Sequence, residues 1–522
     1  MLVTLPKEMQ TVIQSNDGLH RYLEQLSIGR PFTPRSWLYE DLEPEQILEN
    51  WKAHLSTLEN GDTFEKKVFQ FDTSQEAKWG PQGGIAPMEK LLDEIVKPTF
   101  AKHSPASAFT SREWREAVKQ VTYELWHDAN FNRLRPASYK RVLDDMRARD
   151  TLESNSGWPD FQRRNNPGVK ANAVAAAQNG EWLKYPAIAL FRNYNLKTRL
   201  VWMFPMAANV FEGSFMQPVQ SMIVKSQDPF YAPWVGFNRV RERITEIYDD
   251  NKFIYASDFS KTDEHFRWQS TEQVFHALRF LFNHYERPLW LSLHHMHNIP
   301  LIVSTDQMLT GEHGVSSGSN WTNFIETVFD HIFSWYVNQR INDTQMHGLY
   351  AIGDDMAWWS DKFNDAFPEQ LAALGKEVGQ EINAEKVTSD PDSVKTLQRL
   401  FQRGYRRPDG LLKGVYSTIR ALKSSVYPER FHKPKLWSSD MFCARQYMIL
   451  ENCVDHPLFE EFVKFVVQGQ RDLIPFAKKS RASLDRILRE TKLLPGFNPT
   501  YNQERRDTSL ANFESVKIAQ NL

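Results

Sequence analysis

The 522-residue chain is short of several features that would assign it to a class of protein. It has no run of about eighteen apolar residues, so we expect no membrane span. Its start, MLVTLPKEMQ, lacks the basic and then apolar segments of a secretory leader. Its two cysteines, Cys443 and Cys453, are too few for a disulfide framework and match no common zinc spacing. A reducing, cytoplasmic setting is the default expectation.

Net charge is also small, at −2, and by itself it indicates no partner. The charge is unevenly spread, however. Residues 1–100 hold 10 Lys and Arg against 16 Asp and Glu, whereas residues 395–445 hold 12 Lys and Arg against 3 Asp and Glu. A stretch this basic is a candidate path for a polyanion, and a solvated surface face is an equally good interpretation.

What the chain does have is globular composition, with 41% hydrophobic and 25% charged residues. Residues 252–257, KFIYAS, predict a short buried strand. Apolar residues at helical spacing predict one helix over residues 274–285 and another from residue 324 onward, after a loop of small residues at 314–320. GLYAI and MAWW then flank Gly-Asp-Asp, which predicts strand, tight turn, strand. This order indicates an α+β sheet backed by helices.

The turn of that hairpin carries two adjacent acids, Asp354 and Asp355. Asp258 ends the KFIYAS strand, so if that strand pairs beside the hairpin, the acids share one end of the sheet. Clustered carboxylates repel one another unless a hard cation lies among them, and Mg²⁺ binds carboxylate and phosphate oxygens. Two such ions stabilise the attacking and leaving oxygens of phosphoryl transfer. Gly-Asp-Asp taken alone is a weak signal, because most Asp pairs only cap surface turns.

Three segments stand in a fixed order along the chain: Asp258-x4-Asp263, Ser317-Gly318-x3-Thr322 and Gly353-Asp354-Asp355. Together they resemble motifs A, B and C of viral RNA-dependent RNA polymerases and look most like those of picobirnaviruses, with partitivirus enzymes as near relatives. Other segments follow the order of the family: Ser156-Gly157-Trp158-Pro159 resembles motif G, NLKTRLVW motif F, GQEINAEKV motif D and RLFQRGY motif E. Recognisable motifs cover roughly residues 150–410.

The resemblance implies a role for each matched residue. Asp258 and Asp354 would bind two Mg²⁺ ions, for which Mn²⁺ would substitute, and Asp355 would support them. The ribose or the forming base pair would be contacted by Asp263, Ser317, Gly318 and Thr322. Lys197 and Arg199 would contact the triphosphate, and Ser156 and Gly157 the template. Lys386 would act on pyrophosphate as a general acid. The basic stretch after motif E, including Arg403, Arg406 and Lys413, would hold the template and product backbones.

Each assignment has a structural alternative. Asp263 lies three residues after Ser260, which also fits a helix-capping box. Lys197 and Arg199 share one face of a strand and would otherwise be solvated, and Lys386 would otherwise be a surface lysine. The histidines of LHHMHN, residues 293–298, are a poor zinc set without nearby cysteine.

Sugar selection is left open by one departure from the family. Many relatives carry Asn four residues after the motif B threonine, where this chain has Glu326, with Asp330 one turn further on. A glutamate that faces Asp263 needs a proton, a water or a cation between the two carboxyls.

The predicted fold is α+β: a closed right-hand polymerase with fingers, an antiparallel palm backed by helices, and a thumb. We expect an N-terminal segment and fingers in residues 1–250, with a fingers insertion at about 270–310, a palm in 251–420 and a thumb with C-terminal tail in 421–522. The expected partners are template and product RNA and nucleoside triphosphates, and the chain is expected to be a monomer. The resemblance implies a double-stranded RNA genome, a capsid protein as a further partner, and location in the virion interior and host cytoplasm.

Three other functions compete with this interpretation. A reverse transcriptase usually has an aromatic ribose gate and Tyr-x-Asp-Asp, against which Asp263 and Gly353 argue. A non-catalytic RNA-binding or capsid-organising protein would not need the intact acids. A metal-dependent nuclease would need neither the motif B loop nor the basic motif F strand. Whether synthesis starts with or without a primer is left open, and the tail at residues 498–522 is a candidate priming platform or plug.

Overall fold

A computed structural model describes residues 1–430, 433–494 and 509–522 of the chain. These residues divide into two compact units. Unit 1 comprises Met1–Arg30, Ala86–Phe191 and Arg199–Thr396, and unit 2 comprises Pro31–Ile85, Arg192–Thr198 and Leu397–Leu522. The N-terminal segment thus contributes to both units. The division into fingers, palm and thumb at residues 250 and 420 stays a prediction.

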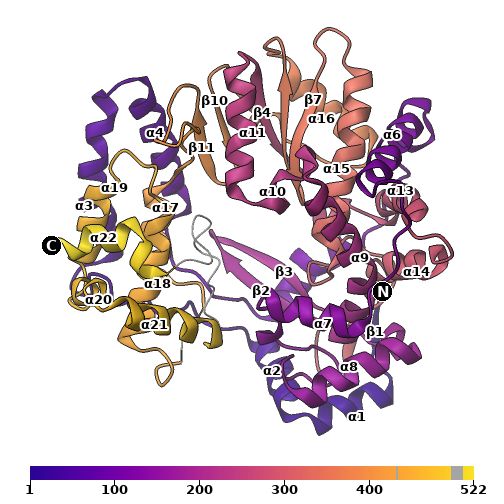
Figure 1. Cartoon of the computed structure of the whole chain (residues 1–522). Coiled ribbons are helices and arrows are strands. Elements are labelled where there is room, and N and C mark those ends of the chain that lie inside the picture. Colours follow the sequence, from indigo (N-terminus) through magenta and orange to yellow (C-terminus); the bar gives the residue numbers. More distant parts are fainter. Residues whose placement is uncertain (431–432, 495–508) are drawn as a thin grey trace. The chain divides into compact units, whose positions relative to one another are not determined.

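Unit 1 holds most of the strands (Figure 1). Its elements are β1 (Leu2–Thr4), α1 (Lys7–Ser15), α2 (Asp17–Ile28), α5 (Met88–Leu91), α6 (Arg112–Asp128), α7 (Tyr139–Ala148), α8 (Pro167–Asn179), β2 (Ala187–Tyr194), β3 (Lys197–Met203), α9 (Met206–Ser226), α10 (Ala232–Val235), α11 (Phe237–Asp249), β4 (Phe253–Asp258), α12 (Thr262–His265), α13 (Trp268–Leu278), α14 (Glu286–Met296), β5 (Leu301–Ile302), β6 (Gln307–Leu309), α15 (Trp321–Arg340), β7 (His347–Ile352), β8 (Asp355–Ser360), α16 (Phe367–Glu377), β9 (Thr388–Ser389) and β10 (Ser393–Thr396). The tip of the β2–β3 hairpin groups with unit 2.

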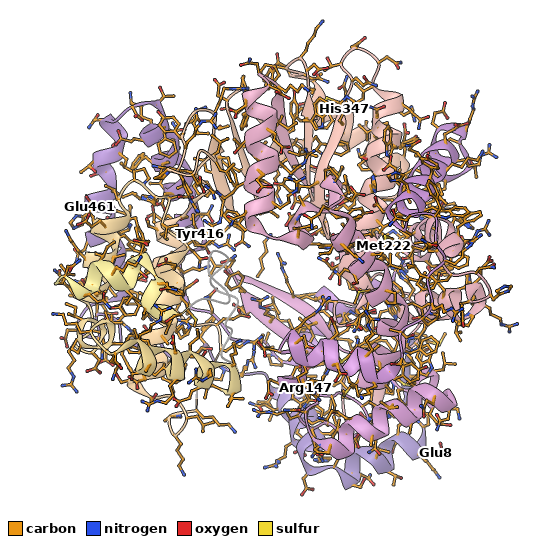
Figure 2. The ribbon with its side chains drawn as sticks, in the orientation of Figure 1. Glu8, Arg147, Met222, His347, Tyr416 and Glu461 are labelled. Carbon is orange, nitrogen blue, oxygen red and sulfur yellow. The ribbon has the colours of Figure 1, made fainter. Side chains whose placement is uncertain are left out.

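The central sheet of unit 1 has the strand order β7-β8-β4-β9. β4 pairs antiparallel with β8 from Phe253 opposite Ser360 to Asp258 opposite Asp355. β7 pairs antiparallel with β8, and His347 at the start of β7 (labelled in Figure 2) stacks on Trp359, with ring centroids 4.1 Å apart. The predicted strand and hairpin are therefore confirmed, and the Gly-Asp-Asp turn lies at the other end of the hairpin from His347.

Helices bury this sheet. α15 packs against β7 and α6, and α11 packs against β4 (Figure 1). Most of α15 is buried on all sides, because its sequence FIETVFDHIFSWYV is apolar around nearly the whole helix. Ile254, Tyr255 and Trp358 of the sheet are fully buried. This packing fixes the strand ends from which the acidic turn projects.

A second sheet of unit 1 has the order β1-β6-β5-β2-β3. β1 pairs with β6 antiparallel, and β5 pairs with β2 in parallel. β3 brings the basic LKTRL segment to one edge of this sheet.

Unit 2 is mainly helical. Its elements are α3 (Pro44–Leu55), α4 (Thr63–Thr73), β11 (Arg399–Gln402), β12 (Val415–Tyr416), α17 (Thr418–Val426), α18 (Ser439–Glu451), α19 (Phe459–Val467), α20 (Leu473–Ala477), α21 (Arg481–Leu493) and α22 (Glu514–Gln520). Its apolar core joins α3 and α4 to α17–α22. Fully buried Trp51 packs on Phe462 there and donates from Nε1 to Thr418 over 2.7 Å. Tyr416, labelled in Figure 2, lies beneath the guanidinium groups of Arg399 and Arg420.

One predicted helix is shorter than expected. α13 ends at Leu278, and a short 3₁₀ turn over Arg279–Leu281 follows. The apolar residues Leu281 and Phe282 are buried as the pattern indicated, but His284 has a φ of +69°, which no α-helix accommodates. The chain therefore turns before α14 begins at Glu286.

No helix among the described residues is both long and apolar enough to cross a membrane. Both cysteines are free and buried.

Candidate active site

The Gly353-Asp354-Asp355 turn requires its glycine. Gly353 has a φ of +59°, and a Cβ there would lie 2.9 Å from the side-chain amide nitrogen of Asn323 and 3.3 Å from a carboxyl oxygen of Glu326. Its backbone N–H donates to the hydroxyl of Thr327 over 2.8 Å. Helix α15 thus holds the turn through Asn323, Glu326 and Thr327, and the turn needs a residue without a Cβ at position 353.

Three acids meet at this end of the sheet. Asp258 is the last residue of β4 and stands directly opposite Asp355 across the β4–β8 ladder. The backbone N–H of Phe259 donates to the carbonyl of Asp354 over 3.4 Å. Directly opposed residues of paired strands project to the same face. The predicted convergence of Asp258 with the hairpin acids is therefore present.

Crowding raises the pKa values of the hairpin acids. Burial is the largest cause for Asp354, and the charge of Asp258 adds to it, while a 3.0 Å hydrogen bond from Thr262 opposes it. Asp355 is exposed at the turn, yet the protein around it and the charges of Asp354 and Asp258 raise its pKa to about 7. The charge of Arg199 lowers both pKa values. The site is an anionic cluster with one nearby cation of its own.

The donor chemistry of the cluster fits hard divalent cations. Carboxylate oxygens are the ligands that Mg²⁺ and Mn²⁺ prefer, and a cation between Asp258, Asp354 and Asp355 would remove the repulsion that raises the two hairpin pKa values. Within residues 1–430, 433–494 and 509–522, however, no group of three or more His, Cys, Asp and Glu side chains has the geometry of a metal-ligand set. The metal assignment stays a prediction.

Asp263 lies in α12, near the acids. Its partly buried carboxyl has a pKa raised by burial, against which the charge of Arg199 acts. The alternative role in a capping box is wrong, because the N-cap of α12 is Lys261, which makes no side-chain cap, and Ser260 instead donates its backbone N–H to Glu381 over 2.7 Å. The carboxyl of Asp263 instead accepts the backbone N–H groups of Asp263 and Glu264, within α12 itself.

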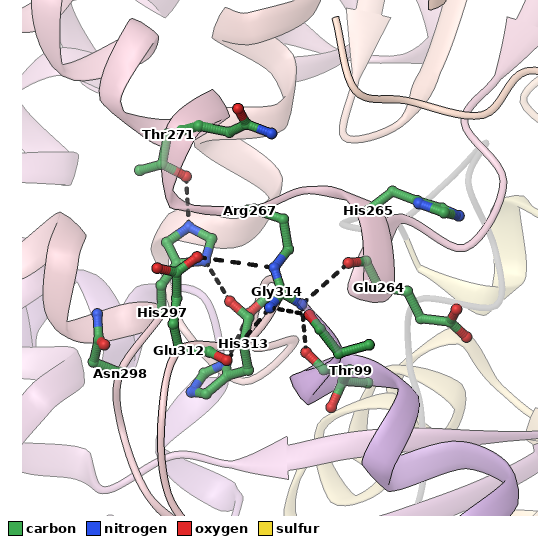
Figure 3. Close-up of polar contacts among 12 residues, drawn as sticks. Thr99, Glu264, His265, Arg267, Thr271, His297, Asn298, Glu312, His313 and Gly314 are labelled. Atoms are coloured by element: carbon green, nitrogen blue, oxygen red, sulfur yellow. Dashed lines mark hydrogen bonds and ion pairs between the residues drawn. The ribbon is translucent and has the colours of Figure 1, made fainter. Parts of the chain in front are cut away.

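Arg267 fixes the segment that carries Asp263 (Figure 3). Its guanidinium is 4% exposed and donates to the carbonyls of Thr99 (2.6 Å), Ala101 (2.7 Å) and Glu264 (3.3 Å). The backbone N–H of Gly314 also donates to the Thr99 carbonyl, over 3.0 Å. Because Arg267 and Gly314 share the Thr99 carbonyl, Arg267 connects the end of α12 to the start of the 314–320 loop.

The loop at residues 314–320 packs tightly before α15. A Cβ on Gly318 would lie 1.8 Å from the carbonyl oxygen of Trp202. Ser317 is exposed, and its hydroxyl accepts the backbone N–H of Trp202 over 3.2 Å. Thr322 donates to the carbonyl of Ser316 over 2.6 Å, so its hydroxyl secures the loop. The positions of Ser317, Gly318 and Thr322 are thus set by the end of β3 and by the loop itself, and their contacts with a nucleotide stay predictions.

Two further acids lie behind this site. Glu326 is 7% exposed and Asp330 is fully buried. Burial raises both pKa values well above the ordinary range, and the charge of Asp354 raises them further. Neither carboxyl oxygen of Asp330 has a hydrogen-bond partner in the described part of the chain. The charge of Asp263 also acts on Glu326, as expected for two carboxyls that face each other.

The Ser156-Gly157 turn is built into unit 1. Ser156 is 3% exposed, and its carbonyl accepts the backbone N–H of Met206 over 2.9 Å. Gly157 has a φ of +65°, and a Cβ there would lie 2.7 Å from the carbonyl oxygen of Phe204. The buried Ser156 side chain bonds within the turn, so any contact with a template would come from the backbone or from neighbouring residues.

The predicted cations are divided between the units. Arg199 is exposed in unit 1, and its charge acts on Asp263, Asp354 and Asp355. Lys197 is exposed at the hairpin tip that belongs to unit 2. Lys386 is exposed in a 3₁₀ turn over Ala384–Lys386. Arg403, Arg406 and Lys413 lie in unit 2 around β11 and the following turn. The roles of Lys197, Lys386 and the last three stay predictions.

Much of the basic stretch 395–445 is used internally. Arg399 is fully buried and donates to the carbonyls of Gly414 and Asn452, and Arg407 makes a two-bond pair with Asp455 at 2.6 Å. The cations Arg420, Lys423 and Arg445 are also buried. The net charge of this stretch therefore overstates what it can offer to a polyanion.

Histidines at 294–297 are structural. Burial lowers the pKa of His295 and His297 to about 3, so both are neutral. His297 lies between the hydroxyl of Thr271 and the carbonyl of His313, at 2.6 and 2.9 Å (Figure 3).

Sequence reasoning missed the polar residues that support the site: Thr262, Arg267, Asn209 and Glu212. The last two occur in α9, whose sequence from residue 206 to 219 is otherwise almost free of charge. A lone acid in an apolar helix is a usable signal, because a buried carboxylate must find partners.

The comparisons with known proteins agree with this geometry. Residues 195–411 match the family described as viral RNA-dependent RNA polymerase. The chain is 27% identical to a potential RNA-dependent RNA polymerase of a human picobirnavirus over 87% of this chain and 86% of that protein. It is 23% identical to the RNA-directed RNA polymerase of Cryptosporidium parvum virus 1 over 30% of this chain and 31% of that protein.

Among solved structures, the crystal structure of the RNA-dependent RNA polymerase of a human picobirnavirus matches 99% of this chain and 100% of its own, with a TM-score of 0.82 and 23% identity. Its insertion-loop deletion mutant matches equally well. The predicted resemblance, the α+β polymerase fold and the enzyme class, RNA-dependent RNA polymerase, are confirmed. An enzyme of this class binds RNA and nucleotides.

Proposed function

Because the chain carries a viral RNA-dependent RNA polymerase domain, we propose that it adds nucleoside triphosphates to the 3′-hydroxyl of an RNA strand with the help of two divalent cations. The observation that carries this proposal is the convergence of Asp258, Asp354 and Asp355 at one sheet end, beside the cation of Arg199. A reverse transcriptase remains disfavoured by the acid at Asp263, and a nuclease by the presence of the 314–320 loop and the basic strand.

The chain's own residues would bind and orient the reactants. Arg199 would neutralise phosphate charge, since its guanidinium already acts on the hairpin acids. Asp263 would accept a hydrogen bond from the ribose 2′-hydroxyl, because a carboxylate has acceptor sites beyond those that the backbone of α12 occupies and because it lies within the influence of Arg199. Asp258, Asp354 and Asp355 would hold Mg²⁺ or Mn²⁺, which lowers the pKa of the 3′-hydroxyl and neutralises charge on the leaving pyrophosphate.

The test is incorporation of labelled nucleotides on single-stranded RNA without primer, with Mg²⁺ or Mn²⁺, for the native chain and for Asp354→Ala. Asp361→Ala is a matched control, because Asp361 is an exposed acid just past the other end of β8. We expect product from the native chain and the control only. If Asp354→Ala makes as much product as the native chain, the assignment of the site is wrong.

An absence of product from all three proteins has two explanations, and repeating the assay with a primer distinguishes them. Product with a primer indicates a polymerase that extends but does not initiate. No product with primer, while RNA still binds, favours the non-catalytic RNA-binding alternative.

We further propose, from the resemblance alone, that the enzyme copies a double-stranded RNA genome as a monomer within a virion, in the host cytoplasm, beside a capsid protein. Incubation with blunt double-stranded RNA and all four triphosphates tests the first point. Labelled full-length strands are expected, and incorporation confined to single-stranded templates would contradict it. Light scattering at working concentration tests the monomer.

A further inference from the structure

Glu212 is a fully buried acid in α9 that forms hydrogen bonds with the loop before α15. Its carboxylate accepts hydrogen bonds from the hydroxyl of Ser319, from the backbone N–H of Asn320 over 3.1 Å and from the side-chain amide of Asn209 over 3.0 Å. Two of these three donors belong to residues 316–320, the second part of the 314–320 loop, which is called the 316–320 loop from here on. Burial raises the pKa of Glu212 to about 7, while these three hydrogen bonds and the charge of Arg164 oppose that rise.

Asn209 continues the contact in both directions. Its amide also donates to the carbonyl of Gly318 over 3.1 Å, and its own carbonyl accepts the side-chain amide of Asn320 over 2.9 Å. Its side-chain oxygen accepts Nη2 of Arg164 over 2.8 Å. Asn209, which is 1% exposed, therefore joins the loop to Arg164.

Arg164 completes the connection to the Ser156-Gly157 turn. Its Nε donates to the carbonyl of Asn155 over 3.1 Å. Burial lowers the pKa of Arg164 to about 10, and the negative charge of Glu212 counteracts this effect. The Arg164–Asn209–Glu212 relay is thus an unbroken set of hydrogen bonds from residue 155 to residue 320.

The backbone of residues 202–206 supports both segments sterically. Gly318 and Gly157 each lie so close to it that a Cβ would fall 1.8 Å from the carbonyl oxygen of Trp202 and 2.7 Å from that of Phe204. Packed segments that share one rigid support have few independent arrangements. A shift of either segment must therefore disturb the relay or this backbone.

We propose that Glu212 is a positioning residue of the polymerase and that the Arg164–Asn209–Glu212 relay couples the residue 155–157 turn to the 316–320 loop. The inference rests on the proposed function for what the two segments meet: template at the turn, and the incoming nucleotide at the loop. Template held at the turn then favours the loop arrangement that binds nucleotide, and coupling of this kind works equally in the opposite direction.

The first test is hydrogen–deuterium exchange on the full chain without ligands, which needs no activity. Glu212→Gln keeps the side-chain volume but removes the charge, and Glu212→Leu removes every hydrogen bond. We expect faster exchange at residues 155–164 and at 316–320 together, more so for Glu212→Leu. Asp72→Asn, a matched change of a fully buried acid in unit 2, is expected to leave both segments unchanged.

Exchange that rises at 316–320 alone would overturn the coupling, and exchange that rises throughout unit 1 would overturn the positioning role. If Glu212→Leu does not fold, Glu212→Gln decides the question. Because exchange is read without turnover, a chain that makes no RNA even with a primer refutes the proposed function and leaves this test intact.

The second test looks for effects across the relay. Ser319→Ala, at the loop end, is expected to weaken template binding measured without nucleotide, and Arg164→Gln, at the turn end, to raise KM for nucleotide at saturating template, each by about 5-fold or more. The double variant is expected to show less than the product of the two effects.

Matched controls exist for both changes. Ser214→Ala removes a buried hydroxyl that bonds only the carbonyl of Phe211 within α9, and Arg163→Gln removes an exposed guanidinium paired with Glu153. Neither is expected to have a cross effect. If Ser319→Ala changes only nucleotide KM, Arg164→Gln changes only template binding and the double variant is multiplicative, the two segments act independently and the proposal is wrong.

Discussion

Thr262 donates a hydrogen bond to the Asp354 carboxylate over 3.0 Å. Thr262 is the first residue of α12 and is 8% exposed, and the next residue is Asp263. One hydroxyl therefore ties the acid of the hairpin turn to the short helix that carries the predicted ribose contact. This bond therefore holds Asp354, a predicted metal ligand, close to Asp263, the predicted ribose contact.

Thr262→Val removes that bond at nearly constant volume. Because the bond favours the ionised form of Asp354, its loss is expected to raise the Mg²⁺ concentration needed for half-maximal nucleotide incorporation, by about 10-fold or more. Thr122→Val, which removes a hydroxyl that bonds within α6, is the control and should leave the curve unchanged. Overlapping Mg²⁺ titrations for native and Thr262→Val protein would contradict the role.

Gly318→Ala is expected to abolish nucleotide incorporation while leaving most of unit 1 folded. The added Cβ would stand 1.8 Å from the carbonyl oxygen of Trp202, so the loop must move. Overpacking of this kind costs about 1–3 kcal/mol. Gly168→Ala is the matched change, since a Cβ there meets only Asn166 at 3.4 Å, and it should retain native activity. Equal activity of the two variants would show that the loop position is not critical.

Arg267→Met is expected to lower the free energy of unfolding by about 1–3 kcal/mol, because a largely buried set of hydrogen bonds is lost. The Thr99 carbonyl would keep only the backbone N–H of Gly314, and the Ala101 carbonyl would lose its 2.7 Å bond from Arg267. Urea unfolding measures the loss, and Arg112→Met, at an 85% exposed side chain, should change stability by no more than about 0.5 kcal/mol. Similar denaturation midpoints for the two variants would refute the anchoring role.

Asp72 makes unit 2 sensitive to acid. Burial alone would raise its pKa, but hydrogen bonds from His456, Ser417 and Thr418 outweigh burial and hold the pKa below its ordinary value. An acid with a lowered folded pKa contributes stability above its unfolded pKa, about 3.9, and that contribution is lost as pH falls through the folded value.

The expected result is a steep loss of native stability below about pH 4 that is shallower in Asp72→Asn. The variant itself should be less stable at pH 7, by about 3–5 kcal/mol, because His456 loses its buried partner. Unfolding measured from pH 6 to pH 3 gives both quantities. Parallel pH curves for the two proteins would exclude Asp72 as the source.

The C-terminal helix α22 belongs to the folded core of unit 2. Glu451 accepts the backbone N–H groups of Glu514 (2.9 Å) and Ser515 (3.0 Å) at its first turn. Removal of residues 509–522 is therefore expected to lower Tm, with Glu451→Gln giving a smaller decrease. A truncated chain with native Tm would contradict this.

A deletion of residues 498–522, the predicted priming platform or plug, would remove this folded helix as well. Residues 498–508 lie outside the described residues, while 509–522 include a helix that packs on α18, α19 and α20. Loss of initiation after the full deletion would not separate a plug from an unstable unit 2.

The sequence allowed the strands and the acidic turn to be predicted because their signals are local. The segment KFIYAS shows little alternation of polar and apolar residues, and it forms the largely buried strand β4. Gly353 adopts the positive φ that its turn needs. The helix over 274–285 was overextended because apolar spacing continues through Phe282, whereas the break depends on the backbone of His284. Periodicity reports burial better than it reports where a helix ends.

The support of the site could not be predicted because its partners are distant in sequence. Glu212 bonds residues 107 and 108 positions away, and Thr262 bonds an acid 92 positions away. The basic stretch is only a partial surface signal for the same reason: Arg399 and Arg407 are occupied by carbonyls and a carboxylate that only the fold brings near. Charge counted along a chain does not show which charges reach solvent.

The register of β4 against β8 limits how this gene can change. Side chains alternate across a strand, so the loss or gain of one codon within residues 253–258 would turn Asp258 to the other face of the sheet, away from Asp355. Exchange of one apolar residue for another there keeps the register. Across related viruses, β4 should therefore vary in amino-acid sequence but not in length, and insertions should occur in the loops that precede and follow it.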